Sequence, residues 1–388
     1  MSFDRRFLLR FSIILVFLVF FIKSIYHSHF LYGERTDLKI CWTAAQNLWE
    51  GLPVYKEDDL WAHTKPPFGT LLFLPLTKIS FHLLANLWDA LNIFLLFYLS
   101  FQFSYDLKRR FNQPLLWSTL LGVLLVINFW GYELRFGQYN LLTLFMIYMG
   151  SKFKDSRYQA PLFWAAFFIK PSNLIFLPWV LKKSKSIKEF FEASAISGVF
   201  LSGLYVTLFG WKALWVDHFQ WLSFMKFATK KYLMREVNYG LPTLIGYITT
   251  SSWPQHLLLI MALFWGMVLV RKVNNDVLLF GLLAVLSLIV SPLTWWATFC
   301  IALPLHLYLG LRAWEMIRGR QFFRGIFLLL IIYSATQLIF PNFLPDFIML
   351  NLPRLANPNW IYLMILIYVS MRKTSFESDY ISGLVSRR

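Results

Sequence analysis

Long apolar runs alternate with short basic clusters along the chain, and this alternation predicts a helical membrane protein. A helix of about 20 apolar residues crosses the hydrocarbon core of a bilayer, so the longer runs are predicted to be membrane spans. We expect an all-α, polytopic protein with a single integral membrane domain over residues 1–388. The apolar runs lie at about 7–25, 67–79, 83–104, 115–130, 140–150, 161–181, 190–209, 254–270, 277–290, 297–311, 326–340 and 360–371.

The basic clusters predict how the chain threads through the membrane. Lysine and arginine gather in loops on the cytoplasmic side, whereas acidic residues contribute little to orientation. We therefore expect a multi-pass protein of the cell membrane with both termini in the cytoplasm, a cytoplasmic tail at 372–388 and a first extracytoplasmic loop at 26–65. The clusters lie at 5–10, 108–110, 152–157, 182–188, 271–272, 312–324 and 372–388.

Composition supports this class and excludes others. Of the 388 residues, 58% are hydrophobic and 15% are charged, whereas soluble domains carry roughly 25% charged residues. The net charge of +17 does not indicate nucleic-acid binding, because the basic residues stand between apolar runs. Cys41 and Cys300 are the two cysteines, too few for a disulfide framework and without metal-binding spacing.

Two apolar runs are predicted to be irregular. The run 67–79 is too short for a span and predicts a short or re-entrant helix. The run 161–181 has a basic cluster on each side, so we expect it to enter and leave on the same face as two half-helices that meet at Lys170-Pro171. Interrupted backbone at membrane depth is tolerated where it lines a cavity, so both pieces predict a cavity that opens outward.

The first extracytoplasmic loop is predicted to hold an amphipathic helix from Leu38 to Trp49 that lies in the membrane interface. Gly51-Leu52-Pro53 is expected to end this helix. Further outer loops are expected at 210–240 and 341–359. The residues on one side of the predicted helix are Ile40, Cys41, Ala44, Ala45 and Leu48.

Asp37 stands at the start of this helix, just outside the first span, and it has two interpretations. Thr36 and Asp37 occupy the positions where a helix N-cap belongs. Alternatively, Asp37 is the general base of an enzyme that deprotonates a polar acceptor at the lipid–water boundary. Position alone leaves both interpretations open.

Two lysines beside the irregular pieces are candidate phosphate-binding groups. Lys65 precedes Pro66-Pro67, a normal start for a helix, and it either snorkels or meets a lipid phosphate. Lys170 lies at membrane depth, where a lysine costs on the order of 2.5–3.5 kcal/mol on insertion scales. We expect Lys170 to face a partner or a wet cavity, with snorkelling to the interface as the alternative.

A polar stretch at 135–140 adds further candidates. Its Gly-Gln-Tyr-Asn sequence is typical of a turn followed by a helix cap. The same stretch places the guanidinium of Arg135 and the amides of Gln138 and Asn140 on the predicted outer face. These groups suit sugar hydroxyls and phosphate.

Two later residues complete the candidate site. Asn238 lies in the predicted outer loop 210–240. Trp295 follows Ser291-Pro292 at the outer end of a predicted span. A belt of interfacial aromatic residues explains Trp295, and so does an aromatic wall beside a sugar.

Taken in order, these segments resemble glycosyltransferase family 87, the polyprenol-phosphate-mannose-dependent mannosyltransferases of the GT-C superfamily. Each motif is short, and their shared order over roughly residues 30–310 carries the resemblance. The matching segments are Asp37, Ala44-Ala45, Leu48-Trp49-Glu50-Gly51-Leu52-Pro53-Val54-Tyr55, Pro66-Pro67, Gly137-Gln138-Tyr139-Asn140, Lys170-Pro171, Asn238-Tyr239-Gly240-Leu241 and Ser291-Pro292-Leu293-Thr294-Trp295.

The chain departs from the family pattern at two places. Gly240 replaces the serine of the family's Asn-x-Ser-Leu. After Trp295, the residues Trp296, Ala297 and Thr298 stand where the family usually carries Asp and His. The role of that histidine therefore does not transfer to this chain.

The resemblance implies a GT-C-type transmembrane bundle of about 10–13 helices, short or re-entrant ones included. It also implies an inverting hexosyltransferase on the extracytoplasmic face. Such an enzyme moves a sugar, usually mannose, from a polyprenyl-phosphate donor to a hydroxyl of a lipid or polysaccharide acceptor. We expect no cofactor beyond this donor and no metal requirement, because no pair of carboxylates converges in the sequence to hold a divalent ion.

In this hypothesis Asp37 is the general base, and Lys170 with Arg135 or Lys65 stabilises the departing phosphate. Gln138, Asn140, Asn238 and Trp295 bind the sugar or the phosphate. The alternative function is a flippase or transporter of lipid-linked sugars, which also uses broken helices, although the two halves of the chain show no convincing inverted repeat. A structural membrane subunit is a third possibility, and it predicts no polar cluster around one cavity.

Overall fold

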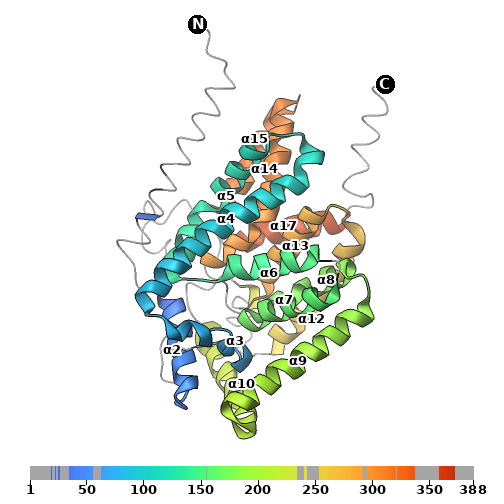
Figure 1. The fold of residues 1–388 in the computed structure, drawn as a ribbon. Coiled ribbons are helices and arrows are strands. Elements are labelled where there is room, and N and C mark those ends of the chain that lie inside the picture. Colours follow the sequence, from blue (N-terminus) through green and yellow to red (C-terminus); the bar gives the residue numbers. More distant parts are fainter. Residues whose placement is uncertain are drawn as a thin grey trace.

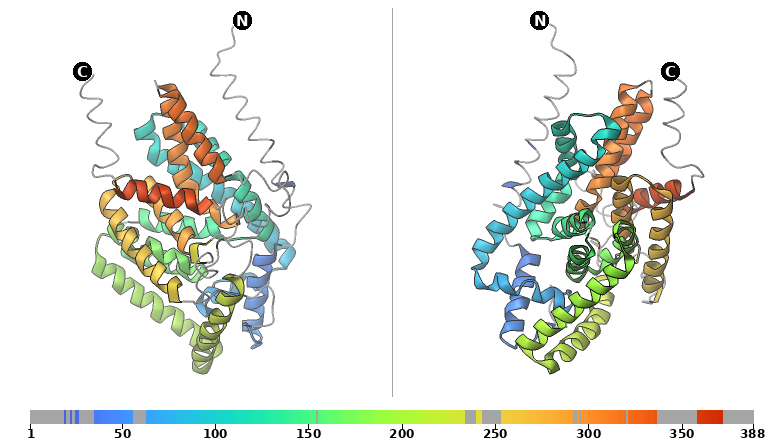
Figure 2. Two further views of the ribbon diagram at one scale, coloured as in Figure 1. Left: turned by 180° about the vertical axis from the view of Figure 1, so that it is seen from behind. Right: turned by 45° about the vertical axis from the view of Figure 1, so that its right-hand side comes forward.

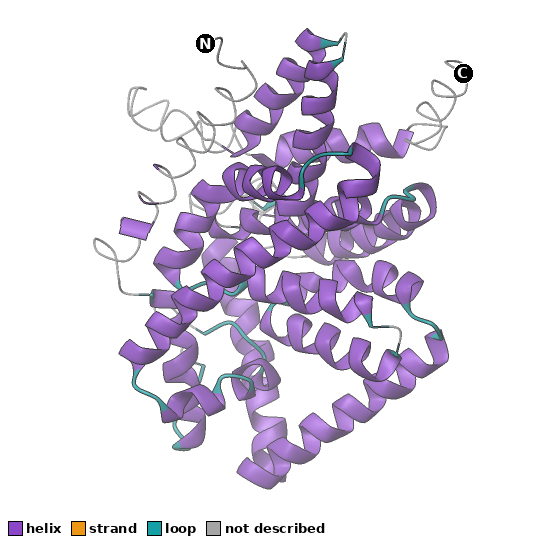
Figure 3. Ribbon diagram, turned by 45° about the horizontal axis from the view of Figure 1, so that its top comes forward, coloured by secondary structure: helices purple, strands orange, loops and turns teal. Residues whose placement is uncertain are grey.

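The computed structural model describes residues 35–55, 63–153, 155–233, 240–242, 253–291, 296–319, 321–336 and 358–371, with the isolated positions 19, 22, 25, 26 and 294. Side chains are described for all of these except 226–233, 253–256, 296, 333–336 and 358. Every regular element in these residues is a helix, and Figure 3 shows no strand among them. The prediction of an all-α fold is confirmed.

Four described helices are long and apolar enough to cross a membrane. They are α4 (Phe81–Phe111), α5 (Leu115–Phe136), α9 (Ile187–Phe209) and the continuous helical stretch Ala297–Arg318, which joins the 3-10 helix η4 (Trp296–Ala302) to α14 (Leu303–Arg318). Each contains one of the predicted apolar runs, so the prediction of a multi-pass membrane protein agrees with the fold. The tail at 372–388 lies outside the described residues, and so do nearly all of the first predicted span, 7–25, and of the loop 341–359.

The helix α13 (Asp276–Val290) forms the centre of the bundle. Every residue from Val277 to Val290 is buried, as the apolar sequence of this run requires. The side chain of Asn275 caps the helix by accepting a hydrogen bond from the Leu278 amide at 2.9 Å. Its neighbours are η4 and α14 with α12 (Trp253–Lys272), α17 (Pro358–Met371) and the 3-10 helix η3 (Pro171–Phe176).

The run predicted to be re-entrant forms a hairpin. It consists of α7 (Ser156–Ile169), an extended residue Lys170, η3 and α8 (Leu177–Lys183). Pro171 removes a backbone donor and disfavours helical geometry at Lys170, so α7 ends at Ile169. The hydroxyls of Ser156 and Ser184, at the two ends of the hairpin, lie 3.0 Å apart. The segment therefore returns to the side on which it entered, as predicted.

The other irregular run, 67–79, is also broken as predicted, into α3 (Pro67–Leu71) and the 3-10 helix η2 (Leu74–Lys78). The predicted amphipathic helix is confirmed as α2 (Thr36–Trp49). Its buried residues are Leu38, Cys41, Ala44, Ala45 and Leu48, which differ from the predicted face by the inclusion of Leu38 in place of Ile40. The predicted outer loop 210–240 holds α10 (Trp211–Leu233), a 23-residue helix.

The elements α2, α3 and α10 gather at one end of the bundle, the lower end in Figure 1, and α14 meets α15 (Phe322–Thr336) at the opposite end. Two turned views in Figure 2 show the same separation. Basic last turns occur in α4, α12 and α14 and in α6 (Asn140–Lys152) and α8. An ion pair of Lys152 with Asp106 joins the ends of α6 and α4, and one of Lys183 with Asp276 joins the end of α8 to the start of α13.

Candidate functional site

Asp37 lies in the first turn of α2, where the positive end of the helix dipole favours a negative charge. The N-cap residue is Arg35, and no side chain caps the helix. The backbone carbonyl of Arg35 accepts from the Lys39 amide at 2.9 Å. The interpretation of Thr36 or Asp37 as a side-chain cap is therefore wrong. The Asp37 carboxylate instead accepts a hydrogen bond from the Nε2 amide of Gln138.

Two neighbouring residues of α4 hold the two segments that form this hydrogen bond. Asp89 accepts from both Nε and Nη2 of Arg35, the Nε contact being 2.9 Å. Trp88 donates from Nε1 to the backbone carbonyl of Gln138 at 2.9 Å. Arg35 is almost fully buried and takes the left-handed backbone conformation, with φ 44°. The start of α2 and the turn at Gln138 are thus both fixed to one turn of α4.

Gly137 allows the α5–α6 turn to approach α2. Its φ is +63°, a conformation that favours glycine. A Cβ atom at this position would lie 2.8 Å from the Cβ of Leu38 and 3.1 Å from the Cβ of Arg35. The glycine of Gly-Gln-Tyr-Asn is therefore needed for both its conformation and its close contact with the helix that carries Asp37.

Glu133 organises the start of α6, and sequence reasoning assigned it no role. Its carboxylate accepts from the backbone amide and from the Nδ2 amide of Asn140, both at 2.7 Å, and from the Leu141 amide at 3.2 Å. Glu133 is fully buried near the end of α5. The sequence did offer a signal for this role: Glu133 is an acidic residue at the end of an apolar run, seven positions before the start of a helix.

Lys170 has the partner that its depth requires. Its ammonium donates to Oδ1 of Asn140 at 2.7 Å, and Nδ2 of the same amide donates to Glu133. Asn140 therefore bridges a partly buried cation and a buried anion. The interpretation of Lys170 as a lysine facing a partner is confirmed over simple snorkelling.

Lys65 is nearly buried beside these groups. Its ammonium lies over the ring of Tyr139, 4.2 Å from the ring centroid, a cation–π contact. The Tyr55 hydroxyl donates to its backbone carbonyl at 2.8 Å. Within the described residues, the salt bridges do not include Lys65.

The electrostatic environment makes Asp37 a weaker acid than an exposed aspartate. Burial raises the pKa of the Asp37 carboxyl to about 6, and the Lys65 ammonium opposes part of that rise. The Lys65 charge also acts on Lys170. Lys65 therefore lies within electrostatic range of both the acid and the second cation.

These contacts bring five of the predicted site residues into one region. Gln138 and Asn140 are two residues apart, so their Cα atoms are separated by at most about 7.6 Å. Gln138 bonds Asp37 and Asn140 bonds Lys170, while the Lys65 side chain covers the intervening Tyr139. We call Asp37, Lys65, Gln138, Asn140 and Lys170 the polar cluster.

The remaining predicted residues are placed differently. The guanidinium of Arg135 lies over the ring of Phe136, 5.2 Å from its centroid, in the last turn of α5. Asn238 and Trp295 lie outside the described residues. Among the part of the chain that is described, no group of three or more His, Cys, Asp or Glu residues gathers to hold a metal ion.

Gly240, two residues after Asn238, contacts Ser291, four residues before Trp295. A Cβ atom there would lie 2.1 Å from the backbone carbonyl oxygen of Ser291. A serine, the residue of the family pattern, does not fit this contact. The departure at Gly240 thus has a steric reason in this fold.

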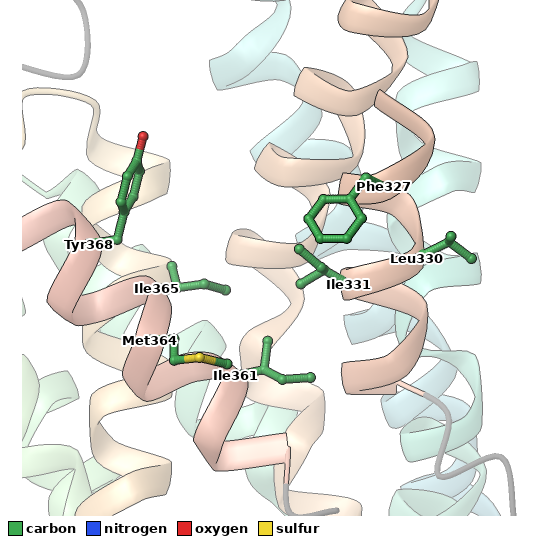
Figure 4. Close-up of a pocket in the computed structure, with 7 residues that line it drawn as sticks. All are labelled: Phe327, Leu330, Ile331, Ile361, Met364, Ile365 and Tyr368. Carbon is green, nitrogen blue, oxygen red and sulfur yellow. The ribbon is translucent and has the colours of Figure 1, made fainter. Parts of the chain in front are cut away.

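One cavity of about 430 Å³ lies elsewhere, between α15 and α17. Phe327 and Ile331 face Ile361 and Ile365 across it, as Figure 4 shows. Its lining is aliphatic and aromatic, with the phenol of Tyr368 as its polar side chain. It offers no group for sugar chemistry, so the polar cluster is the candidate site.

Comparison with known proteins gives one match. A model of glycosyltransferase family 87 matches residues 63–292, more than half of the chain and all of the polar cluster except Asp37. Neither the curated proteins nor the solved structures include a match to the chain. With a family match of this extent on a bundle of apolar helices, the chain belongs to glycosyltransferase family 87 and is a membrane glycosyltransferase.

Proposed function

We propose that this protein transfers a sugar, mannose in the first instance, from a polyprenyl-phosphate donor to a hydroxyl group of a lipid or polysaccharide acceptor, with inversion at the anomeric carbon. The observation that carries the proposal is the polar cluster, which sets one acid beside two lysines. Asp37 is tied through Gln138 to the same three-residue turn that holds Lys170 through Asn140.

Asp37 is the general base of this mechanism. Its pKa of about 6 leaves the carboxylate ionised at neutral pH, yet basic enough to take a proton from an alcohol as the alcohol attacks. The acceptor oxygen forms a bond to the anomeric carbon while the bond from that carbon to the phosphate oxygen breaks. The acceptor proton passes to Asp37, and the electron pair leaves with the polyprenyl phosphate.

The two lysines stabilise the charge that develops on the leaving phosphate. Lys65 fits this role best, because its ammonium lies against an aromatic ring and within range of Asp37. Asn140 links Lys170 to the Glu133 carboxylate, which offsets part of the lysine charge. Asn140 also holds the Lys170 ammonium in a fixed position, from which it attracts the phosphate. Monophosphate release of this kind needs no divalent ion, and we propose metal-independent transfer.

The amides and the aromatic residue complete the proposal. Gln138 orients the Asp37 carboxylate, and Asn140 orients the Lys170 ammonium. Asn238 and Trp295 are proposed to bind sugar hydroxyls and a sugar face, respectively. Arg135, one turn before Gly137, is proposed to meet the phosphate from the edge of the site.

The extracytoplasmic location of the site is part of the proposal. The helices α4, α6, α8, α12 and α14 end in basic turns. At the polar cluster, α7 ends without a basic residue in its last turn, and α5 ends with Arg135 alone. Basic loops mark the cytoplasmic side. The polar cluster lies at the start of α6 and beside the first turns of α4, away from the basic ends of these two helices, which supports a site on the extracytoplasmic side.

The test is transfer by purified protein in liposomes that contain polyprenyl-phosphate sugars of several kinds. Asp37→Asn is expected to lower turnover by about 10²–10⁴-fold, the contribution of a positioned base. Glu50→Gln, an exposed acid at the other end of the same helix, is the matched control and is expected to be active. Normal turnover by Asp37→Asn contradicts the mechanism. Movement of the donor lipid across the bilayer without a new glycosidic bond supports the flippase alternative instead.

A further inference from the structure

The outer surface of α10 carries an apolar stripe. Trp211, Trp215, Phe219 and Leu222 are exposed by 63%, 51%, 65% and 55%. Their spacing of three and four residues places them on one side of the helix. The ring of Trp215 lies 5.9 Å from that of Trp211 and 6.3 Å from that of Phe219, between centroids. A continuous aromatic row thus faces away from the protein.

Polar residues flank this stripe on the same exposed surface. Lys212, Gln220 and Ser223 are exposed, and successive residues of a helix are about 100° apart. The exposed surface is therefore apolar on one side and mainly polar on the other, where Val216 is an exposed apolar residue. The whole helix contains four lysines and one aspartate, and it is absent from the candidate spans among the described helices.

The apolar stripe continues the exposed apolar surface of a candidate membrane span. The preceding helix α9 is a candidate span, and its Ile196, Val199 and Phe200 are exposed. The chain turns at Gly210 and runs directly into α10, as Figure 1 shows at the lower end of the bundle. An amphipathic helix with tryptophans at the end of a span is typical of the membrane interface.

The inner surface of α10 packs against the segment that carries Lys65. Nε1 of Trp221 donates to the backbone carbonyl of Thr64 at 3.1 Å. The ring of His218 lies 4.7 Å from that of Phe68. Asp217 accepts from the hydroxyl of Tyr205, on α9, at 2.6 Å. The position of α10 therefore sets the position of residues 64–68.

We propose that α10 lies in the headgroup region of the bilayer, with Trp211, Trp215, Phe219 and Leu222 inserted at the boundary with the acyl chains, and that this docking fixes the depth of Lys65. The partner is the lipid surface of the leaflet next to the polar cluster. The exposed Lys212 of α10 adds attraction to anionic headgroups.

Site-specific labels test the docking without any assay of activity. Cys41 and Cys300 are both buried, so a thiol-reactive, polarity-sensitive fluorophore can be directed to Phe219→Cys or to its neighbour Gln220→Cys in the full-length protein in liposomes. The label at 219 is expected to emit at shorter wavelength and to be quenched by lipids with a nitroxide near the headgroup. The label at 220 is expected to be quenched by aqueous iodide.

Two results overturn the docking. Equal quenching of both labels by iodide places α10 in water, and quenching of both by a nitroxide deep in the acyl chains makes α10 a span. The proposed effect of docking on the depth of Lys65 rests on the proposed function. If docking sets this depth, Trp215→Ala should raise KM for a long-chain lipid donor several-fold, with little change for a short-chain, water-soluble analogue. An equal rise for both donors contradicts the link to Lys65 but leaves the label result intact.

Discussion

The side-chain amide of Gln138 donates a hydrogen bond to the carboxylate of Asp37, although the two residues are 101 positions apart in the chain. The bond engages Oδ2 of Asp37, and no described residue donates to Oδ1. A carboxylate held by one oxygen keeps the other available for an acceptor hydroxyl. In the proposed mechanism, Oδ1 is therefore the atom that takes the acceptor proton.

The first prediction concerns pH. Since burial raises the pKa of Asp37 to about 6, the base is protonated, and inactive, below that value. We expect kcat/KM to fall about tenfold per pH unit below pH 6 and to level off above it. Lys65 holds this pKa down, so Lys65→Met should move the acid limb to higher pH, in addition to weakening donor binding.

The control for this shift is Lys39→Met, which removes an exposed lysine from the same helix as Asp37. The pH profile of this variant should match that of the unaltered protein. A Lys65→Met profile with an unmoved acid limb would show that another group sets the pH dependence.

The second prediction separates the structural and chemical roles of Lys170. Lys170→Met leaves Glu133 without the cation that Asn140 brings to it, and removing one partner of a buried pair is strongly destabilising. We expect a lower apparent melting temperature in detergent together with loss of transfer. The double variant Glu133→Gln with Lys170→Met should regain thermal stability without regaining transfer. Recovery of both would reduce Lys170 to a structural residue.

The sequence predicts much of the fold because its signals are local. The break at Lys170-Pro171 is visible in a proline that cannot continue α7 and in basic clusters on both sides of the run. The amphipathic face of α2 is visible in its spacing. In contrast, the sequence predicts a loop where α10 forms, because the segment contains four lysines and its apolar stripe is exposed rather than packed in the core.

The candidate site is less predictable because its geometry depends on distant contacts. Motif order identified Asp37, Gln138 and Lys170, and the fold brings them together. Nothing local to Asp89 shows that it binds Arg35, 54 positions away. Glu133 was likewise missed, since its partner atoms exist only once the α5–α6 turn has formed.

The third prediction concerns the close contact at Gly137. An alanine there combines an unfavourable φ, on the order of 1–2 kcal/mol, with a Cβ that would approach Leu38 to 2.8 Å. Gly137→Ala should therefore displace α2 and lower both stability and turnover. Gly51→Ala is the matched control: its φ is +69° but no atom lies within 4 Å of the added Cβ. It should lose some stability and keep full turnover; equal turnover losses would point to backbone strain alone.

The fourth prediction assigns a positioning role to the Arg35–Asp89 pair. Arg35 lies two residues before Asp37, and both Nε and Nη2 of its guanidinium bond the Asp89 carboxylate, so Asp89→Asn removes one half of a buried, charge-assisted pair. Because neither residue belongs to the polar cluster, kcat should fall at least tenfold while KM for the donor changes about twofold or less. Arg35→Lys, which keeps the charge but loses the planar fork, should retain intermediate activity.

The exposed pair Asp155–Arg157 is the control for this fourth prediction, because surface ion pairs contribute about 0–1 kcal/mol. Asp155→Asn should leave kcat, KM and the melting temperature unchanged. If Asp89→Asn instead raises KM and leaves kcat intact, the pair acts on donor binding and not on the orientation of Asp37. A melting temperature lowered by Asp89→Asn with kinetics unchanged would leave the pair a purely structural role, since a displaced base must slow the proton transfer that it performs.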